Sequence, residues 1–156
     1  MQGAFDALYP AGQQWYWRGD FVDSVPDEAV AVHHRFAEAL PTPQSTMHLY
    51  PIDGAVHRVA PGDTAWGRRE ATFSQVIVGV DPDPALTSTL RRWAVDYSEA
   101  LRPFTAAGGY VNFLMADEPD KVRASYGENY DRLAALKERY DPQNVLRNNQ
   151  NVPPAG

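Results

Sequence analysis

His48 and Tyr50 are the first side chains in this sequence whose types and spacing suit proton transfer. They lie two residues apart in a stretch typical of a β-strand, residues 45–52, so both would point to the same face of a sheet. An imidazole titrates near neutral pH, and a phenol can donate or accept a hydrogen bond beside it. The pair predicts one wall of a binding site, where it could transfer protons. An equal alternative is that His48 is a core histidine whose hydrogen bonds are satisfied.

Amide side chains form a second group with chemical potential. Asn112 lies in an otherwise apolar stretch, residues 110–115, where a buried amide without partners would lose about 1–3 kcal/mol. Five more amides gather near the end of the chain: Asn144, Asn148, Asn149, Gln150 and Asn151. Uncharged amides suit the mixed donor and acceptor edge of a heterocycle. Turns and caps in an irregular tail are the alternative.

Several other kinds of site are missing from the sequence. There is no Cys, which excludes disulfides, thiolate metal ligands and a cysteinyl link to a flavin within this chain. Neither G-x-G-x-x-G nor G-x-x-x-x-G-K-[ST] occurs, so no phosphate-cradling loop is predicted. His33 and His34 would point about 100° apart on a helix and cannot both face one metal ion. We therefore predict no metal site.

Composition indicates one globular domain with an acidic balance. The 156 residues are 44% hydrophobic and 22% charged, and the formal charge is -6. This charge argues against nucleic acid or an anionic membrane as the main partner, because both require clustered Lys and Arg. No apolar run approaches the ~18 residues of a membrane span, and residues 1–20 lack a basic segment leading into an apolar one. A cytoplasmic location is the default expectation. The 12% of aromatic residues fits either a large core or a wall for a planar ligand.

Periodicity predicts the elements that would position these side chains. Residues 1–13 are expected to form a connector. Strands are predicted over residues 14–21, 45–52, 55–59, 71–80 and 110–115, with a tight turn at Asp53-Gly54. One helix is predicted from a start signal at Ser24 to Leu40, and another from an N-cap at Asp83 to Leu101. Two more helices are expected over residues 119–125 and 127–140, followed by a tail without periodicity.

The predicted element order is β-α-β-β-β-α-β, followed by a helical extension. An antiparallel sheet with two helices packed on one face satisfies this order with right-handed crossovers. We therefore predict an α+β fold, ferredoxin-like in its simplest version. The expected organisation is a sheet over residues 1–116 and a helical segment with an irregular tail over residues 117–156, which together form one structural unit.

The last third of the chain resembles the C-terminal signature of berberine-bridge-enzyme-like FAD-linked oxidases. The matching positions at fixed spacing are residues 126–133 (YGENYDRL), Leu136-Lys137, Tyr140-Asp141-Pro142, Asn144 and Asn149-Gln150-Asn151. Residues 110–113 (YVNF) resemble the family's Tyr-x-Asn-[Tyr/Phe] strand. Weaker similarity at residues 15–17, at residues 53–56 and at Arg69 extends the resemblance over almost the whole chain.

The resemblance implies an FAD enzyme that oxidises alcohols, sugars or amines. In that family an antiparallel sheet backed by helices covers the reactive face of the flavin, and the C-terminal segment returns to the flavin domain. Asn112 would then lie near the isoalloxazine edge, and Asn149 and Gln150 would contact the flavin-domain side. Tyr110, His48 and Tyr50 would be the candidate catalytic residues on the substrate wall.

Two departures from the family pattern affect this interpretation. Phe113 stands where many sugar- and alcohol-oxidising relatives have a Tyr that can act as general base, and a phenyl ring cannot take a proton. The family's N-terminal flavin domain, with its phosphate contacts and attachment residues, has no counterpart in residues 1–20. Each charge-assisted hydrogen bond is worth about 1.5–3 kcal/mol, so tight binding of FAD by this chain alone is not expected.

Three functions remain open from the sequence. The first is the C-terminal part of an FAD-dependent oxidoreductase, which covers the flavin, forms the substrate wall and is inactive without a flavin-binding domain in the same or a separate chain. The second is a stand-alone homodimeric module that binds a small molecule on its open sheet face. The third is an inactive truncated remnant.

Overall fold

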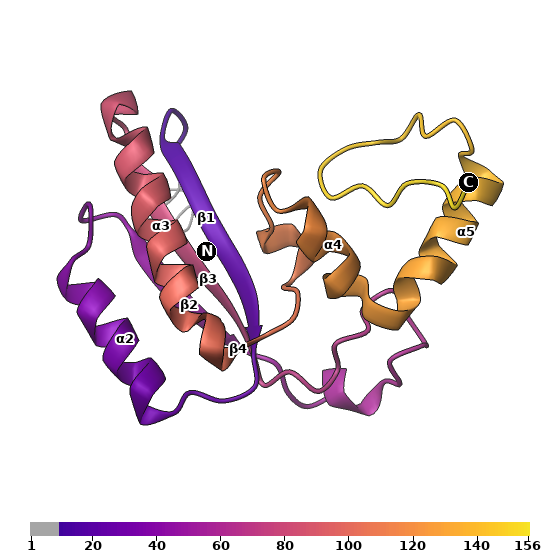
Figure 1. Cartoon of the computed structure of the whole chain (residues 1–156), viewed down its shortest axis with the longest axis horizontal. Helices are drawn as coiled ribbons and strands as arrows, with labels where there is room; N and C mark the ends of the chain where they lie inside the picture. The colour runs from indigo at the N-terminus through magenta and orange to yellow at the C-terminus, as the bar shows by residue number, and fades with distance from the viewer. Residues whose placement is uncertain (1–9) are drawn as a thin grey trace.

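A four-stranded antiparallel sheet organises the chain in the computed structural model, which describes residues 10–156. The strands are β1 (Gln14–Val22), β2 (Thr46–Pro51), β3 (Phe73–Asp81) and β4 (Thr105–Ala106). Their order across the sheet is β2-β3-β1-β4, and every neighbouring pair is antiparallel. Figure 1 shows β1 and β3 at the centre of this sheet. Most of the connector predicted over residues 1–13 lies outside the described residues.

Two helices cover one face of the sheet. Helix α2 (Asp27–Glu38) follows β1, and α3 (Thr87–Leu101) follows β3 (Figure 1). The buried face of α3, which includes Trp93, Tyr97 and Leu101, packs on Tyr16 of β1 and Ile77 of β3. The predicted cap before this helix is present, because the Asp83 side chain accepts a hydrogen bond from the Ala85 backbone N–H at 2.9 Å. The predicted α+β fold with two helices on one face is confirmed.

The predicted third strand, residues 55–59, is wrong. After Asp53 the chain turns through Gly54 at φ 58° into a single 3₁₀ turn, η1 (Val56–Arg58). The Val56 N–H bonds to the Asp53 carbonyl at 3.2 Å, so the local backbone satisfies its own hydrogen bonds. The observed element order is therefore β-α-β-β-α-β, and β3 pairs with both β2 and β1.

The predicted strand over residues 110–115 is also wrong. These residues form a 3₁₀ turn, η4 (Val111–Phe113), and the fourth strand is instead the two-residue β4 that precedes them. The reason is a close crossing: a Cβ on Gly109 would lie 2.5 Å from the Gly19 carbonyl oxygen, and a Cβ on Gly19 would lie 2.5 Å from Phe113 Cβ. The paired glycines let this segment cross β1, where it cannot extend the sheet.

The C-terminal segment lies beyond β1 and away from α2. It contains α4 (Pro119–Tyr126), a 3₁₀ turn η5 (Gly127–Asn129), α5 (Tyr130–Tyr140) and an irregular tail. Figure 1 shows α4, α5 and the tail on the opposite side of the molecule from α2. Both helices predicted for this segment are present. No helix within residues 10–156 is long and apolar enough to cross a membrane.

Candidate functional site on the open sheet face

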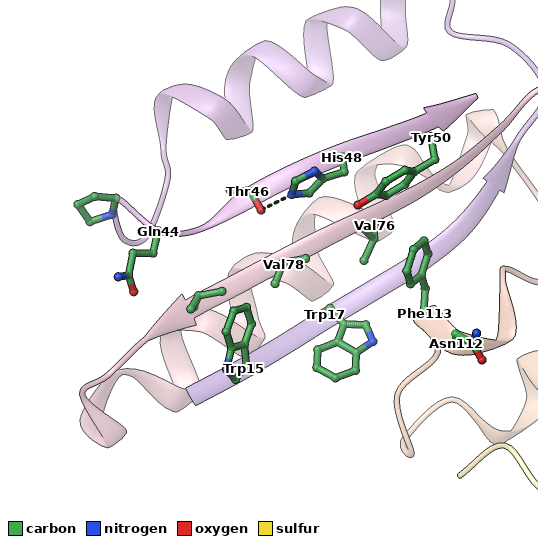
Figure 2. Close-up of a pocket in the computed structure, with 12 residues that line it drawn as sticks. Trp15, Trp17, Gln44, Thr46, His48, Tyr50, Val76, Val78, Asn112 and Phe113 are labelled. Atoms are coloured by element: carbon green, nitrogen blue, oxygen red, sulfur yellow. Dashed lines mark hydrogen bonds between the residues drawn. The ribbon is translucent and has the colours of Figure 1, made fainter. Parts of the chain in front are cut away.

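A groove with a cavity volume of about 560 Å³ lies on the sheet face that the helices leave open. Figure 2 shows its side chains standing off the three longer strands, with the helices behind them. Strand alternation explains the composition, because every second residue of a strand points to the same face. The lining residues are Trp15 and Trp17 of β1, Thr46, His48 and Tyr50 of β2, Val76, Val78 and Val80 of β3, Pro43 and Gln44 before β2, and Asn112 and Phe113 of η4.

Aromatic contacts build one end of the groove. The rings of His48 and Tyr50 stack with centroids 5.7 Å apart, and Tyr50 lies 5.6 Å from Phe113. Phe113 meets Tyr110 edge-on at 5.1 Å, and Tyr110 packs against Trp66 at 5.0 Å. The close crossing of η4 over β1 therefore brings residues from distant parts of the chain to one end of the open face.

Of the predicted catalytic residues, His48 and Tyr50 line this end of the groove, whereas Tyr110 is not among its lining residues and contacts Phe113. His48 is half-buried, and its Nε2 lies 2.9 Å from Thr46 Oγ1 on the same face of β2. Asn112 donates a hydrogen bond from Nδ2 to the Tyr110 phenol oxygen at 2.7 Å. The expectation that Asn112 is buried in a strand is wrong, because its side chain is exposed on the 3₁₀ turn.

Asn149 and Gln150 do not line this groove. They lie on a separate cavity of about 200 Å³ that is formed with α4 and the segment before it. Gln150 Nε2 donates to the Leu114 carbonyl at 2.5 Å, which ties the tail to the segment that follows η4. Asn144 and Asn149 each have φ 51°, a left-handed conformation that Asn tolerates, so turn chemistry accounts for their backbone. Asn149 itself is exposed.

Comparison with known proteins points to one family. Residues 109–153 match the family model described as berberine and berberine like. The FAD-linked oxidoreductase YgaK of Bacillus subtilis is 31% identical over 137 residues, which is 87% of this chain and 30% of YgaK. An FAD-linked oxidoreductase of Dictyostelium discoideum is 24% identical over 156 residues, which is 99% of this chain and 34% of that protein. The chain thus spans about a third of the length of these relatives.

The chain is similar to a C-terminal portion of the berberine-bridge-enzyme-like FAD-linked oxidases. Solved structures agree in fold. A berberine-bridge-enzyme-like protein of Arabidopsis thaliana superposes with a TM-score of 0.79 at 19% identity, covering 94% of this chain and 35% of that one. A variant of berberine bridge enzyme gives 0.75 at 20% identity, covering 92% and 34%.

FAD is the cofactor that this resemblance implies. The groove fits the ring system of FAD better than its phosphates. Most of its lining residues are aromatic or aliphatic, and the exposed amide of Asn112 stands at one end, where it can meet the polar edge of a heterocycle. The Trp17 indole N–H, on the same sheet face, is buried and has no acceptor among the described residues. None of the lining residues is a Lys or Arg that could pair with a phosphate.

Sequence reasoning missed a charge network that fixes the family's C-terminal segment to the sheet. The Arg18 guanidinium donates to both carboxylate oxygens of Asp117 at 3.0 and 2.9 Å, and Tyr16 and Arg91 donate to the same carboxylate at 2.8 and 3.1 Å. Hydrogen bonding from Arg18 holds the pKa of Asp117 well below its usual range, and burial is the largest cause that raises the pKa of Tyr16 to about 12. The alternating Arg and Asp inside β1 were the available signal.

The network continues along the same face of β1. Lys121 of α4 lies 2.7 Å from Asp20 and 2.8 Å from Glu118, and the side chains of both acids are almost fully buried. Buried charges of this kind must be paired, and each pair here joins β1 or the segment after η4 to α4. The groove residues Asn112 and Phe113 are thereby held between two fixed points of the segment. These are Gly109, which packs against Gly19 of β1, and Asp117.

Asn129, part of the family's signature, positions the long loop between β2 and β3. Its buried amide donates to the Pro61 and Thr64 carbonyls at 2.8 and 3.1 Å. This loop carries Trp66, which packs on Tyr110 at the end of the groove. Asn129 therefore supports the groove from outside it.

Proposed function

We propose that this chain is the substrate-wall part of an FAD-dependent oxidoreductase. Its open sheet face covers the reactive face of a flavin, and the groove holds the substrate between sheet and flavin. The observation that carries the proposal is that His48, Tyr50 and Asn112 line an aromatic-walled groove on that face, where Asn112 is hydrogen-bonded to Tyr110.

When bound, the flavin supplies a two-electron acceptor that takes a hydride from a substrate C–H bond. The chain's own residues bind the substrate, exclude water and accept the proton of a substrate hydroxyl or amine. His48, oriented by Thr46, is the first candidate acceptor. Tyr110 is the second, because its phenol oxygen accepts a hydrogen bond from Asn112, which lines the groove. Phe113 contributes shape alone.

A flavin-binding domain, in the same chain or a separate one, is the partner that this proposal requires. Exposed apolar side chains on α5 and the tail support such a partner: Tyr140, Val145 and Leu146 are 72%, 74% and 78% exposed. Large apolar side chains exposed to this degree on neighbouring residues of one segment are typical of an interaction surface. Asn149 and Gln150 stand on the same tail, so we assign them to the flavin-domain side of the interface.

The visible absorption spectrum tests the proposal. The 156-residue chain should be colourless when purified and should not retain FAD on gel filtration. Mixed with a cognate flavin-binding domain and FAD, it should co-elute with that domain and raise the amount of bound flavin. Asp substitutions at Val145 and Leu146 should weaken co-elution, while Val30→Asp, an exposed site on α2, should not. A cognate domain that neither binds the chain nor gains oxidase activity from it would refute the proposal.

A homodimeric binding module is the competing function, and the free edge of β2 favours it. This strand pairs only with β3 among residues 10–156, and the exposed Tyr50 lies on it. An unpaired edge can template pairing with a second copy. Sedimentation equilibrium separates the two functions, because a monomer at every concentration that still binds the flavin domain excludes the dimer.

A further inference from the structure

The groove on the open face carries no formal charge, and this limits the substrate class of the proposed function. None of its lining residues within the described chain is Asp, Glu, Lys or Arg. The charged residues of β1, Arg18 and Asp20, point to the opposite face, where they pair with α4 and its preceding segment. A charged ligand would lose hydration in this groove without gaining a counter-ion. The groove therefore favours an uncharged substrate.

The floor and one side of the groove favour a flat aromatic ligand. Val76, Val78 and Val80 form an apolar floor on β3, and the indoles of Trp15 and Trp17 stand along β1 (Figure 2). Aromatic side chains stack on other rings in offset or edge-on arrangements and bury large apolar areas. The hydroxyls on both faces of a sugar ring would find no partners on the valine floor, and unpaired buried polar groups are costly. A polyhydroxylated sugar is therefore disfavoured.

Hydrogen-bonding groups line the other side, along β2. Thr46, His48 and Tyr50 alternate on the groove face of this strand, and the Thr46 hydroxyl bonds the His48 ring at 2.9 Å. Phe113 closes the nearby end of the groove with a ring that neither donates nor accepts. A ligand that fits both sides has apolar faces and carries its polar group on one edge only.

We infer that the groove takes an uncharged, flat, fused-ring aromatic substrate that carries an alcohol group on one edge, with its hydroxyl on a carbon that bears the C–H bond to be oxidised. The ring faces lie against Val78 and the two indoles of β1, and the hydroxyl points to His48. This inference rests on the proposed function for the identity of the site, and it assigns the substrate class that the site selects.

Three small probes of similar size test the inference on the 156-residue chain: 2-naphthol, 2-naphthoate and methyl glucoside. The readout is the set of ¹⁵N-labelled indole signals, because the four Trp residues divide into two in the groove, Trp15 and Trp17, and two outside it, Trp66 and Trp93. We expect 2-naphthol to shift the two groove signals at micromolar to millimolar concentration and to leave the Trp93 signal in place. The anion and the sugar should bind at least about tenfold more weakly.

Variants separate recognition from a general apolar surface. Val78→Glu puts a charge on the floor and should abolish the 2-naphthol shift, whereas Val30→Glu, on exposed α2, should not. Val78→Thr keeps the shape and β-propensity and should weaken binding several-fold even if Val78→Glu does not fold. Naphthalene should bind more weakly than 2-naphthol, and this difference should disappear in His48→Phe.

Several results would overturn the inference. The first two are equal shifts with 2-naphthoate or methyl glucoside, and 2-naphthol shifts that are confined to Trp66 or Trp93. The third is a difference in affinity between 2-naphthol and naphthalene that survives in His48→Phe. The fourth is the absence of any shift of the Trp15 and Trp17 signals. None of these readouts involves flavin. A chain that binds 2-naphthol but never docks to a flavin-binding domain would refute the proposed function alone, and a chain that docks but ignores 2-naphthol would refute the substrate class alone.

Discussion

Asp117→Ala should lower the free energy of unfolding far more than the loss of an exposed Arg–Asp ion pair would. The Arg18 side chain is only 10% exposed, and its guanidinium makes two hydrogen bonds to Asp117. Removing one partner of a buried pair costs about 3–5 kcal/mol, because a charge is left buried without its counter-ion. Two features reduce this figure: Asp117 is 38% exposed, so solvent screens it, and Glu118 lies 3.5 Å from Arg18 as a second carboxylate. We therefore expect a loss of about 2 kcal/mol.

Asp131→Ala is the matched control for this prediction. Arg123 and Asp131 form the same kind of ion pair at 2.7 Å, but their side chains are 62% and 81% exposed. An exposed pair contributes about 0.2–1 kcal/mol, so this variant should lose at most half of what Asp117→Ala loses. Urea unfolding followed by circular dichroism measures both. Equal losses in the two variants would refute the idea that Asp117 anchors the C-terminal segment.

The pH dependence of the same variant gives a second check. The pKa of Asp117 is lower in the folded protein than in the unfolded chain, chiefly because of the hydrogen bond from Arg18. The stabilising contribution is therefore fully present above the unfolded pKa, about 3.9, and is lost as pH falls through the folded pKa. The difference in unfolding free energy between wild type and Asp117→Ala should be constant near neutral pH and should shrink below about pH 4. A difference that grows in acid would contradict the assignment.

Three further predictions follow from close contacts and burial. Gly19→Ala should cost about 1–3 kcal/mol in urea unfolding, because its Cβ would lie 2.5 Å from Phe113 Cβ, whereas Gly62→Ala meets open space and should be nearly neutral. Asn129→Ala removes two hydrogen bonds to loop carbonyls and should cost about 1–3 kcal/mol by the same assay. Burial raises the pKa of Tyr97 to about 12, so its contribution to stability is complete below about pH 10 and is lost as pH rises through 12. Because Tyr16 also titrates late, absorbance at ~295 nm should show one late-titrating tyrosine fewer in Tyr97→Phe than in wild type.

The main layers of this fold could be predicted from short-range patterns. The run of β-branched residues in β3 predicted a central strand, and the apolar stripe of α3 predicted the helix face that packs on it, because both signals depend only on residue spacing. The segments at 55–59 and 110–115 have similar apolar patterns, but neither pairs as a strand in the folded chain. Pairing is a property of the whole sheet, so local propensity cannot decide it. The glycines at 19 and 109 mark the crossing that displaces the second segment, but their meaning depends on contacts between distant residues.

Part of the candidate site could be predicted, because it depends only on residue spacing within one strand. His48 and Tyr50 share one strand, so their common face follows from the period of the pleat alone. Trp17 lies on β1, beyond β3 in the sheet, and Phe113 lies on the crossing turn, so these two residues join the site only through tertiary contacts. The Arg18–Asp117 pair spans 99 residues of sequence, and no local pattern indicates which acid meets which base.

The family signature in the last third of the chain acts on the groove indirectly. Asn129 holds the loop that carries Trp66, Trp66 packs on Tyr110, and Tyr110 accepts the hydrogen bond from Asn112 at the end of the groove. Each contact is short-ranged, but together they connect η5, the turn between α4 and α5, to the side chains proposed to meet substrate and flavin. A segment with few groove-lining residues of its own therefore matters for the site, because it sets the position of residues on other elements. Substitutions in this segment should change the groove's ligand affinity and the protein's stability together, whereas Val78→Thr should change affinity with little effect on stability.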